Sequence, residues 1–446
     1  MNERPTNPLA VFTVALMSLA LSAGVITFAQ DARTPAPSLP ARILTLAQAE
    51  EFALRNHPLI AAAGLQINVS REQITETRSV YFPAVYGNFT GVAADHDTVL
   101  AAGALQTSSL SSRSAAGLGL NQLVSDFGRT VDLVRSARLQ AEARTQDAAD
   151  VRARVLLRVR QAYYQVLAAV SVQTVAQAAL ENRRLTLRQV SALAQSNLKS
   201  TLDVNFAEVL VSEAELAVYQ AESALHQSTA ELSAAMGNQS DIDFRLADEP
   251  LPAPINDSVD AVIAGALHDR PDLQALALTG RASHQFAQAE KKLNYPSINI
   301  LGAAGIIPDR DSTLLHNDYS AVGVNISVPI FNGKLFTARY EEADLRARIN
   351  DKNMENLKIN IARDVRVAWF EAEDALHRMD VTSRLVAQAN EALRLAQARY
   401  ENGLGSIVEL NEAQLNQTYA EIAAAGAKYE YLGHRAVLDY TTGEIH

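Results

Sequence analysis

The sequence predicts a mainly α-helical protein with a small β part and an internal duplication. Two segments, 129–236 and 334–402, contain neither glycine nor proline, the residues that usually interrupt helices. Four short segments instead alternate apolar residues with small or polar ones, which is the period of a β-strand. Motifs of the first half recur in the same order in the second half, and such a duplication decides how the whole fold is assigned.

The repeated motifs define two units, 44–237 and 258–443, each with a helix, two strands and a long helical hairpin. The matching motifs are Asn56-His57-Pro58 with Asp269-Arg270-Pro271, Tyr81-Phe82-Pro83 with Asn294-Tyr295-Pro296, Asp126-Phe127-Gly128 with Phe331-Asn332-Gly333, and Met236-Gly237 with Thr442-Gly443. Residues 238–257 are the expected linker between the units, and we expect irregular structure there, at mid-height of the helices.

Residues 1–29 have the pattern of a secretory signal peptide. Arg4 supplies a positive charge, residues 9–28 are almost wholly apolar, and Thr27-Phe28-Ala29 places small residues before a cleavage site. The apolar run is also long enough for a transmembrane anchor. However, a Pro-rich linker, residues 30–43, follows it instead of a basic stop-transfer flank. We therefore expect cleavage after Ala29 and export of the mature chain.

Apolar residues in the two uninterrupted segments recur at spacings of three and four, so each helix has one apolar face. At a rise of about 1.5 Å per residue, a helix over 129–194 is about 100 Å long, which no compact domain holds. The shorter helices predicted over 58–80 and 201–236 together match that length, as do those over 271–293 and 406–441. Each unit is therefore expected to pair one continuous helix with two helices stacked end to end, in a coiled-coil-like array.

The four predicted strands lie at 85–91, 118–121, 298–302 and 322–330. The last is the clearest, since every second residue from Val322 to Ile330 is β-branched. With flanking residues, each strand reaches about 9–12 residues, the length that a tilted strand needs to cross a bilayer. Each segment taken alone also fits an ordinary half-buried sheet. The signal peptide and the long helices favour the membrane alternative.

Four strands form a sheet with two open edges, and each unpaired backbone group in hydrocarbon costs several kcal/mol. About eight strands are the practical minimum for a closed barrel, so one chain cannot close a barrel alone. Three chains would give a twelve-stranded barrel wide enough for a pore, and would place their helices in a hollow ring. We therefore predict a homotrimer in which four strands per chain contribute to a membrane β-barrel, continued by a long α-helical barrel.

Short motifs mark both ends of each helical hairpin. They are Asn56-His57-Pro58 after Leu46-Ala47-Gln48-Ala49, Tyr81-Phe82-Pro83, Val328-Pro329-Ile330-Phe331-Asn332-Gly333, and Ala398-Arg399-Tyr400-Glu401-Asn402-Gly403. In order, spacing and duplication the chain resembles the TolC family of outer-membrane efflux proteins, which are trimeric channel-tunnels. The resemblance implies a barrel in the outer membrane and a helical tunnel in the periplasm. It also implies docking to an inner-membrane transporter through a periplasmic adaptor, in a tripartite efflux pump or a type I secretion system.

The turns between the paired long helices lie farthest from the strands, at the expected periplasmic mouth. In the family, these turns carry a Val-Gly-Leu-like signature that contacts the adaptor. The second turn here reads Asn402-Gly403-Leu404 and the first reads Ser196-Asn197-Leu198. Asn tolerates the left-handed conformation that glycine adopts in such turns. Arg188 and Arg394 precede the turns and are further candidate contacts; the alternative is that each is an ordinary solvated residue.

Acidic residues just past these turns are candidates for a gate at the mouth. Glu409 and Glu412 share a helix face, and the resemblance implies rings of negative charge there that narrow the mouth and favour cations. Asp203 holds the corresponding place after the first turn. Gly405 stands where relatives can carry an arginine, so an ionic latch is not expected, whereas Tyr400 is expected to hydrogen-bond to Asp203. The alternative is that these carboxylates are simply exposed on a helix.

Composition and missing motifs argue against other classes of protein. A net charge of −11 without a basic stripe argues against nucleic-acid binding. The lack of cysteine excludes disulfides and thiolate metal sites. Scattered histidines and the absence of phosphate-loop or nucleophile motifs predict no enzyme, cofactor or metal site. A periplasmic coiled-coil adaptor or scaffold without a barrel is the remaining alternative, and the duplicated strands argue against it. The transported substrate, the pump class and the resting state of the mouth stay open.

Overall fold

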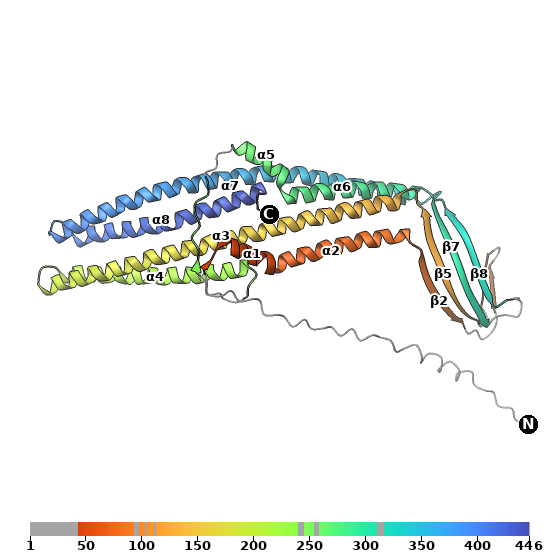
Figure 1. The fold of residues 1–446 in the computed structure, drawn as a ribbon, viewed down its shortest axis with the longest axis horizontal. Helices are drawn as coiled ribbons and strands as arrows, with labels where there is room; N and C mark the ends of the chain where they lie inside the picture. Colours follow the sequence, from red (N-terminus) through yellow and green to blue (C-terminus); the bar gives the residue numbers. More distant parts are fainter. Residues whose placement is uncertain are drawn as a thin grey trace, which may run out of the picture. The chain divides into compact units, whose positions relative to one another are not determined.

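The computed structural model describes residues 43–92, 98–102, 105–110, 113–239, 245–253, 258–309 and 316–445. Long helices dominate these residues, and a four-stranded sheet lies at one end of them (Figure 1). The predicted signal peptide, residues 1–29, lies outside the described residues, as does the linker after it up to residue 42. Within the described part of the chain, none of the helices is long and apolar enough to traverse a bilayer.

The two halves have the same order of helices and main strands. The elements of the first half are β1 (Ile43–Leu44), α1 (Leu46–Asn56), α2 (Pro58–Arg78), β2 (Ala84–Val92), β3 (Thr98–Ala102), β4 (Leu105–Leu110), β5 (Arg113–Ser125), α3 (Arg129–Gln195) and α4 (Thr201–Ala235). Those that follow are β6 (Arg245–Leu246), α5 (Val259–Asp269), α6 (Pro271–Lys291), β7 (Ser297–Asp309), β8 (Asp318–Ser327), α7 (Leu335–Glu401) and α8 (Ile407–Thr442). The mainly α-helical, duplicated fold predicted from the sequence is confirmed.

The halves correspond residue by residue. A shift of 213 positions carries α1 and α2 onto α5 and α6, and a shift of 206 carries α3 onto α7 and the start of α4 onto that of α8. The second shift also aligns Phe127 and Gly128 with Gly333 and Lys334, all of which have positive φ. The predicted match of Asp126-Phe127-Gly128 with Phe331-Asn332-Gly333 was therefore wrong by one residue. Each half needs two successive left-handed residues, and each has placed its glycine at a different one of them.

The shorter helices stack end to end, as predicted. Gly237 follows α4 with a φ of 80°, and a Cβ added to it would lie 2.8 Å from the Cα of His57, which caps α2. Gly443 follows α8 in the same way, and a Cβ there would lie 3.2 Å from the backbone nitrogen of Arg270, which precedes α6. Because a left-handed glycine carries no side chain, the next helix can begin directly against it.

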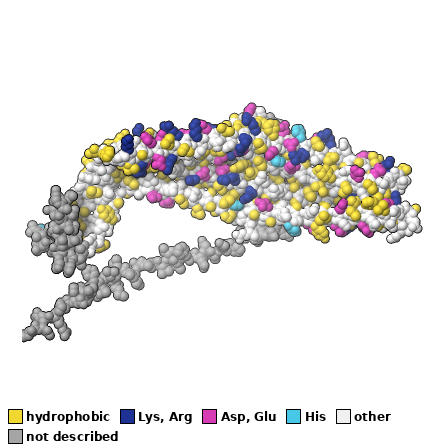
Figure 2. Space-filling model, turned by 180° about the vertical axis from the view of Figure 1, so that it is seen from behind, with side chains coloured by type: hydrophobic (Ala, Val, Ile, Leu, Met, Phe, Trp, Pro, Cys, Tyr) yellow, Lys and Arg dark blue, Asp and Glu magenta, His cyan; other side chains and the backbone are white. Residues whose placement is uncertain are grey.

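The helices pack side by side in a single layer (Figure 1). Their order is α2, α3, α6, α7 in the half near the sheet and α4, α3, α8, α7 in the half near the turns. One edge of the layer is therefore formed by α2 and α4, and the other by α7. Figure 2 shows that apolar side chains remain exposed along these helices and on the sheet.

The sheet is antiparallel, with the strand order β2-β5-β7-β8. Its register places Asn299 opposite Asn325 and Ser297 opposite Ser327, so one face is polar. Val322, Val324 and Ile326 alternate with these residues and are exposed on the other face. The predicted strands thus have the expected two-faced character, and β2 and β8 are its open edges.

Three details of the strands differ from the prediction. β8 ends at Ser327, although the alternation continues to Ile330, because Pro329 has no backbone N–H to donate to a neighbouring strand. A separate hairpin of β3 and β4 lies between β2 and β5, where no strand was predicted. A parallel pair of two residues each, β1 with β6, was also missed, since so short a segment has no detectable period.

A strap, residues 245–253, joins the two halves and is fixed to several helices. The hydroxyl of Tyr163 in α3 lies 2.7 Å from the carbonyl oxygen of Ala247 and 2.9 Å from that of Leu44. Lys428 of α8 lies 2.7 Å from a carboxylate oxygen of Asp248. The strap therefore crosses from α3 to α8, the helix pair that connects the two halves.

Candidate functional site

The two turns that join the long helices share one backbone conformation. Asn197 and Gly403 occupy corresponding positions, with φ values of 55° and 70°. Asparagine therefore adopts the left-handed conformation expected of it. Leu198 and Leu404 follow at corresponding positions, and both are exposed at the ends of the hairpins. Each hairpin thus presents an exposed leucine on a fixed turn.

Serines begin the helices that leave the turns. The Ser200 hydroxyl accepts a hydrogen bond from the backbone N–H of Leu202, and the Ser406 hydroxyl accepts one from that of Glu409. Such caps satisfy N–H groups that the first turn of a helix leaves free. The ends of both hairpins are therefore well-defined surfaces.

Tyr400 connects the two hairpins. It packs with Val190, Ile407 and Leu410 in a buried apolar cluster. Lys199, from the first turn, lies 3.8 Å from the centre of the Tyr400 ring and donates a hydrogen bond of 3.4 Å to its carbonyl oxygen. A cation over an aromatic face is attracted by the ring electrons. Lys199 thus ties the first turn to the end of α7.

The expected hydrogen bond between Tyr400 and Asp203 is absent. Among the described residues, the buried Tyr400 hydroxyl has no hydrogen-bond partner. Burial, and secondarily the charge of Asp203, raises the pKa of Tyr400. The prediction was wrong because it assumed a polar setting for the ring, whereas the apolar cluster on one side and Lys199 on the other hold it in place.

The predicted acidic residues lie near the turns but differ in their surroundings. Glu409 lies 3.0 Å from Arg399, which also donates a hydrogen bond to the carbonyl oxygen of Leu404. Its charge is therefore partly neutralised within its own turn. Glu412 is exposed one turn further along α8, and Asp203 is half-buried in the first turn of α4.

The two predicted arginines also differ. Arg394 forms two hydrogen bonds to Glu391, of 2.8 and 2.6 Å, and these raise the pKa of Arg394. Arg188 is exposed on α3. Both point away from the buried cluster around Tyr400, so each is available at the surface, Arg394 as one member of an ion pair.

Sequence reasoning missed a buried arginine between the hairpins. Arg183 of α3 hydrogen-bonds to Gln414 and, at 3.3 Å, to Thr418, both of α8. Burial lowers the pKa of Arg183 to about 10. No motif marks this residue, or Lys199, because the partners are more than 200 positions away in the chain.

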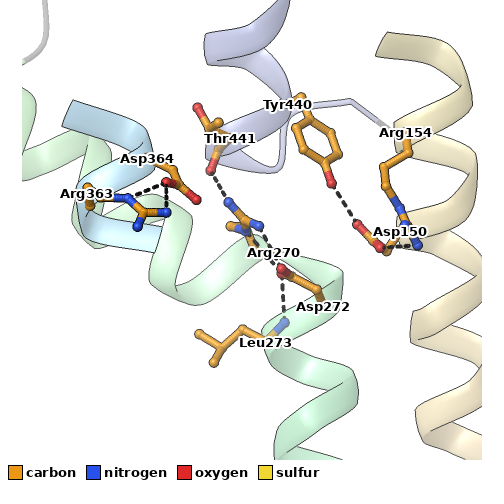
Figure 3. Close-up of polar contacts among 9 residues, drawn as sticks. All are labelled: Asp150, Arg154, Arg270, Asp272, Leu273, Arg363, Asp364, Tyr440 and Thr441. Carbon is orange, nitrogen blue, oxygen red and sulfur yellow. Dashed lines mark hydrogen bonds and ion pairs between the residues drawn. The ribbon is translucent and has the colours of Figure 1, made fainter. Parts of the chain in front are cut away.

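A second polar cluster lies where α8 ends against α6 (Figure 3). Asp272 accepts hydrogen bonds of 3.0 and 2.6 Å from the buried guanidinium of Arg270, which also donates to the carbonyl oxygen of Thr441 at 3.4 Å. Tyr440 donates a hydrogen bond of 3.1 Å to Asp150 of α3, and burial raises the pKa of Asp150. These contacts join α3, α6 and α8 at one level.

Comparison with known proteins covers most of this architecture. The profile of the outer membrane efflux protein family matches residues 51–238 and 262–444, the two duplicated units. The chain belongs to this family. Its membership confirms the predicted recognition, and it places this protein in the outer membrane with its helical tunnel in the periplasm.

Individual outer membrane efflux proteins and their structures agree with this assignment. Outer membrane protein OprJ of Pseudomonas aeruginosa is 25% identical over 379 residues, covering 84% of this chain and 78% of OprJ. Outer membrane protein TolC of Salmonella enteritidis is 21% identical over 425 residues, covering 90% and 83%. The crystal structure of CusC has a TM-score of 0.77 at 18% identity, covering 89% of this chain and 92% of CusC. The predicted role as an outer-membrane efflux component is thereby confirmed, and family members are transport ducts.

Proposed function

We propose that three copies of this efflux protein close into a tube, a passive exit duct for substrates that an inner-membrane transporter and a periplasmic adaptor deliver. Support comes from the edges of the chain. The sheet ends in β2 and β8, and the helical layer ends in α2 and α4 on one side and α7 on the other. Joining β8 and α7 of one copy to the opposite edges of the next satisfies both layers at once.

The observation that carries this proposal is a difference between α3 and α7. Ile349 and Ile359 of α7 are 57% and 69% exposed. Their counterparts after the shift of 206, Ala143 and Ala153 of α3, are each 3% exposed. α3 is covered by the second half of its own chain, so α7 should be covered by the first half of another copy. Apolar side chains of this size otherwise stay in water at a cost of about 1.5–3 kcal/mol each.

Three copies fit a duct better than two. Two copies supply eight strands, and side chains fill the interior of a barrel of that size. Three copies supply twelve strands and leave a pore lined by the polar face of the sheet. The tube is therefore proposed as a homotrimer in outer-membrane lipid.

The proposed trimer is tested by placing a charge on the exposed edge of α7. Ile359→Glu should remove most of the trimer, because each copy would bury an unpaired carboxylate at a cost of several kcal/mol. Native mass spectrometry of the detergent-purified protein measures the trimer fraction. Lys358→Glu is the matched control, since Lys358 and its counterpart Arg152 are both exposed and should tolerate the change. An intact trimer in Ile359→Glu would contradict the proposed interface.

The free ends of the hairpins are proposed as the periplasmic mouth. The turn residues and their flanking arginines would contact the adaptor: Arg188, Asn197, Leu198, Arg394, Gly403 and Leu404. Threefold symmetry would bring the acidic residues and their neighbour into a gate near the axis: Asp203, Tyr400, Glu409 and Glu412. The two exposed leucines on equivalent turns support a repeated docking surface, and the uncompensated Glu412 supports a preference for cations.

The structure predicts unequal roles for the two glutamates. Glu412→Gln should lower the cation selectivity of the channel more than Glu409→Gln, because Arg399 already offsets the charge of Glu409. Reversal potentials in planar bilayers under a salt gradient measure this. Arg399→Gln is the complementary variant and should increase cation selectivity by exposing the charge of Glu409. Equal selectivity in all three variants would exclude these side chains from the conducting path.

A further inference from the structure

The duplication gives the proposed tube two kinds of seam. The seam within a chain is where α3 meets α6 and α8. The seam between copies would be where α7 meets α2 and α4 of the next copy. Because shifts of 206 and 213 relate the halves, each contact in the first seam identifies two residues that should face each other in the second. This step rests on the proposed trimer.

Polar contacts cross the seam within a chain from the sheet to the turns. They are Asp132 with Lys292 at 2.6 Å, Arg129 with Glu290 at 3.3 Å, Asp150 with Tyr440 at 3.1 Å, Arg160 with Asp439 at 3.6 Å, Arg183 with Thr418 at 3.3 Å, and Lys199 with the ring of Tyr400 at 3.8 Å. Most of these side chains are buried or half-buried, so water and salt weaken the contacts less than they weaken surface pairs.

The corresponding positions in the seam between copies lack these ties. In the same order they are Ala338 with Ser79, Leu335 with Thr77, Asn356 with Ala234, Arg366 with Ser233, Ala389 with Ser212, and Gly405 with Ala194. None of these six couples can form an ion pair between its own two members. The seam between copies must therefore depend on apolar contacts at these positions, such as those of Ile349 and Ile359.

The contrast is greatest at the turns. Within a chain, Lys199 reaches across to Tyr400 and holds the two hairpins together. Between copies, the corresponding couple is Gly405 and Ala194, which have no side chain able to reach. A mouth built from three such chains has three tied seams alternating with three untied ones.

We infer that the mouth widens along the three seams between copies, while the two hairpins of each chain move as one body. A rigid-body movement separates the interface that has the fewest directional contacts. The surface between copies is thus the moving surface, and Lys199 and Arg183 hold each chain's hairpins together during the movement.

Engineered thiols can test the inference, because the chain has no cysteine of its own. Ala194→Cys combined with Gly405→Cys marks the seam between copies. Lys199→Cys combined with Tyr400→Cys marks the seam within a chain. Both double variants are treated with the same short bifunctional methanethiosulfonate, which reduction removes. Denaturing gels report which chains are joined, and conductance in planar bilayers is measured before and after reduction.

The single variants serve as controls for each double variant. Gly405→Cys matters most, since a Cβ at Gly405 would lie 3.2 Å from the Cβ of Arg399 and its own effect must be known. Native mass spectrometry of the untreated variants confirms that each remains a trimer before cross-linking.

Cross-linking 194 to 405 should yield covalent trimers and lower the conductance at least threefold, with recovery on reduction. Cross-linking 199 to 400 should join no chains and leave the conductance within twofold of its starting value. The inference is overturned if trimers form but 194 and 405 do not cross-link, if their cross-link leaves the conductance unchanged, or if the 199–400 cross-link lowers it equally. Absence of a trimer in the unmodified protein would instead refute the proposed tube itself.

Discussion

Gly237→Val is expected to destabilise the folded protein by about 3 kcal/mol or more, because it combines an unfavourable backbone conformation with a steric clash. Gly237 has a φ of 80°, which a β-branched residue rarely adopts. Its new Cβ would also lie 2.8 Å from the Cα of His57 and 3.3 Å from Cδ of Pro58. These atoms start α2, so neither can rotate away as a flexible side chain would.

The loss should appear as a lower unfolding temperature, followed by circular dichroism in detergent, and as less protein in the outer membrane. Gly426→Ala is the matched control, since Gly426 lies inside α8 and a Cβ there meets nothing within 4 Å. Alanine in a helix interior is favoured over glycine by about 0.5–1 kcal/mol, so this variant should be unchanged or more stable. A valine at 237 without effect would mean that α4 and α2 do not abut.

Asp272→Asn is expected to cost about 2–3 kcal/mol, because it leaves the buried guanidinium of Arg270 without its carboxylate. The substitution keeps the shape of the side chain and removes only its charge. The carbonyl oxygen of Thr441 and the ring of Tyr440 would remain as partners of Arg270, and neither carries a negative charge. Urea unfolding of the detergent-solubilised protein measures the difference in the free energy of unfolding.

Asp150→Asn, in the same cluster, should have the opposite character. Burial raises the pKa of Asp150, so the folded chain holds this proton more tightly than the unfolded chain does. The ionised form therefore opposes folding above that pKa, and an amide removes the penalty while still accepting the hydrogen bond from Tyr440. Asp150→Asn should be neutral or slightly stabilising at neutral pH. Similar losses in both variants would show that the cluster responds to any change of charge.

The helical part of the fold was readable from the sequence, because uninterrupted helices depend on local features. The bounds of α3 and α7 follow from the glycines and prolines that flank them, and the stacking of α4 on α2 followed from adding helix lengths. The hairpin of β3 and β4 was not readable, and the short pair β1 with β6 has too few residues to show a period. The shift of one residue near Gly128 arose because identity of glycines was taken for identity of backbone.

The candidate site was less readable, since its contacts join residues far apart in the chain. The turn positions of Asn197 and Gly403 were identified correctly, because a left-handed residue has a local signature. The neighbours that set their electrostatics were not. Lys199 comes from the opposite hairpin to its partner Tyr400, and the pairing of Arg399 with Glu409 depends on the path of the turn between them.

The residue-by-residue correspondence of the halves also bears on the ancestry of such chains. A gene encoding only one half would have had to build the same wall from six identical subunits, with one interface serving every junction. Any residue strengthening one junction would then have strengthened all six. Fusion of two genes removed that constraint, since a lysine at 199 no longer requires a lysine at 405. Doubling the polypeptide thus allowed neighbouring junctions to evolve independently.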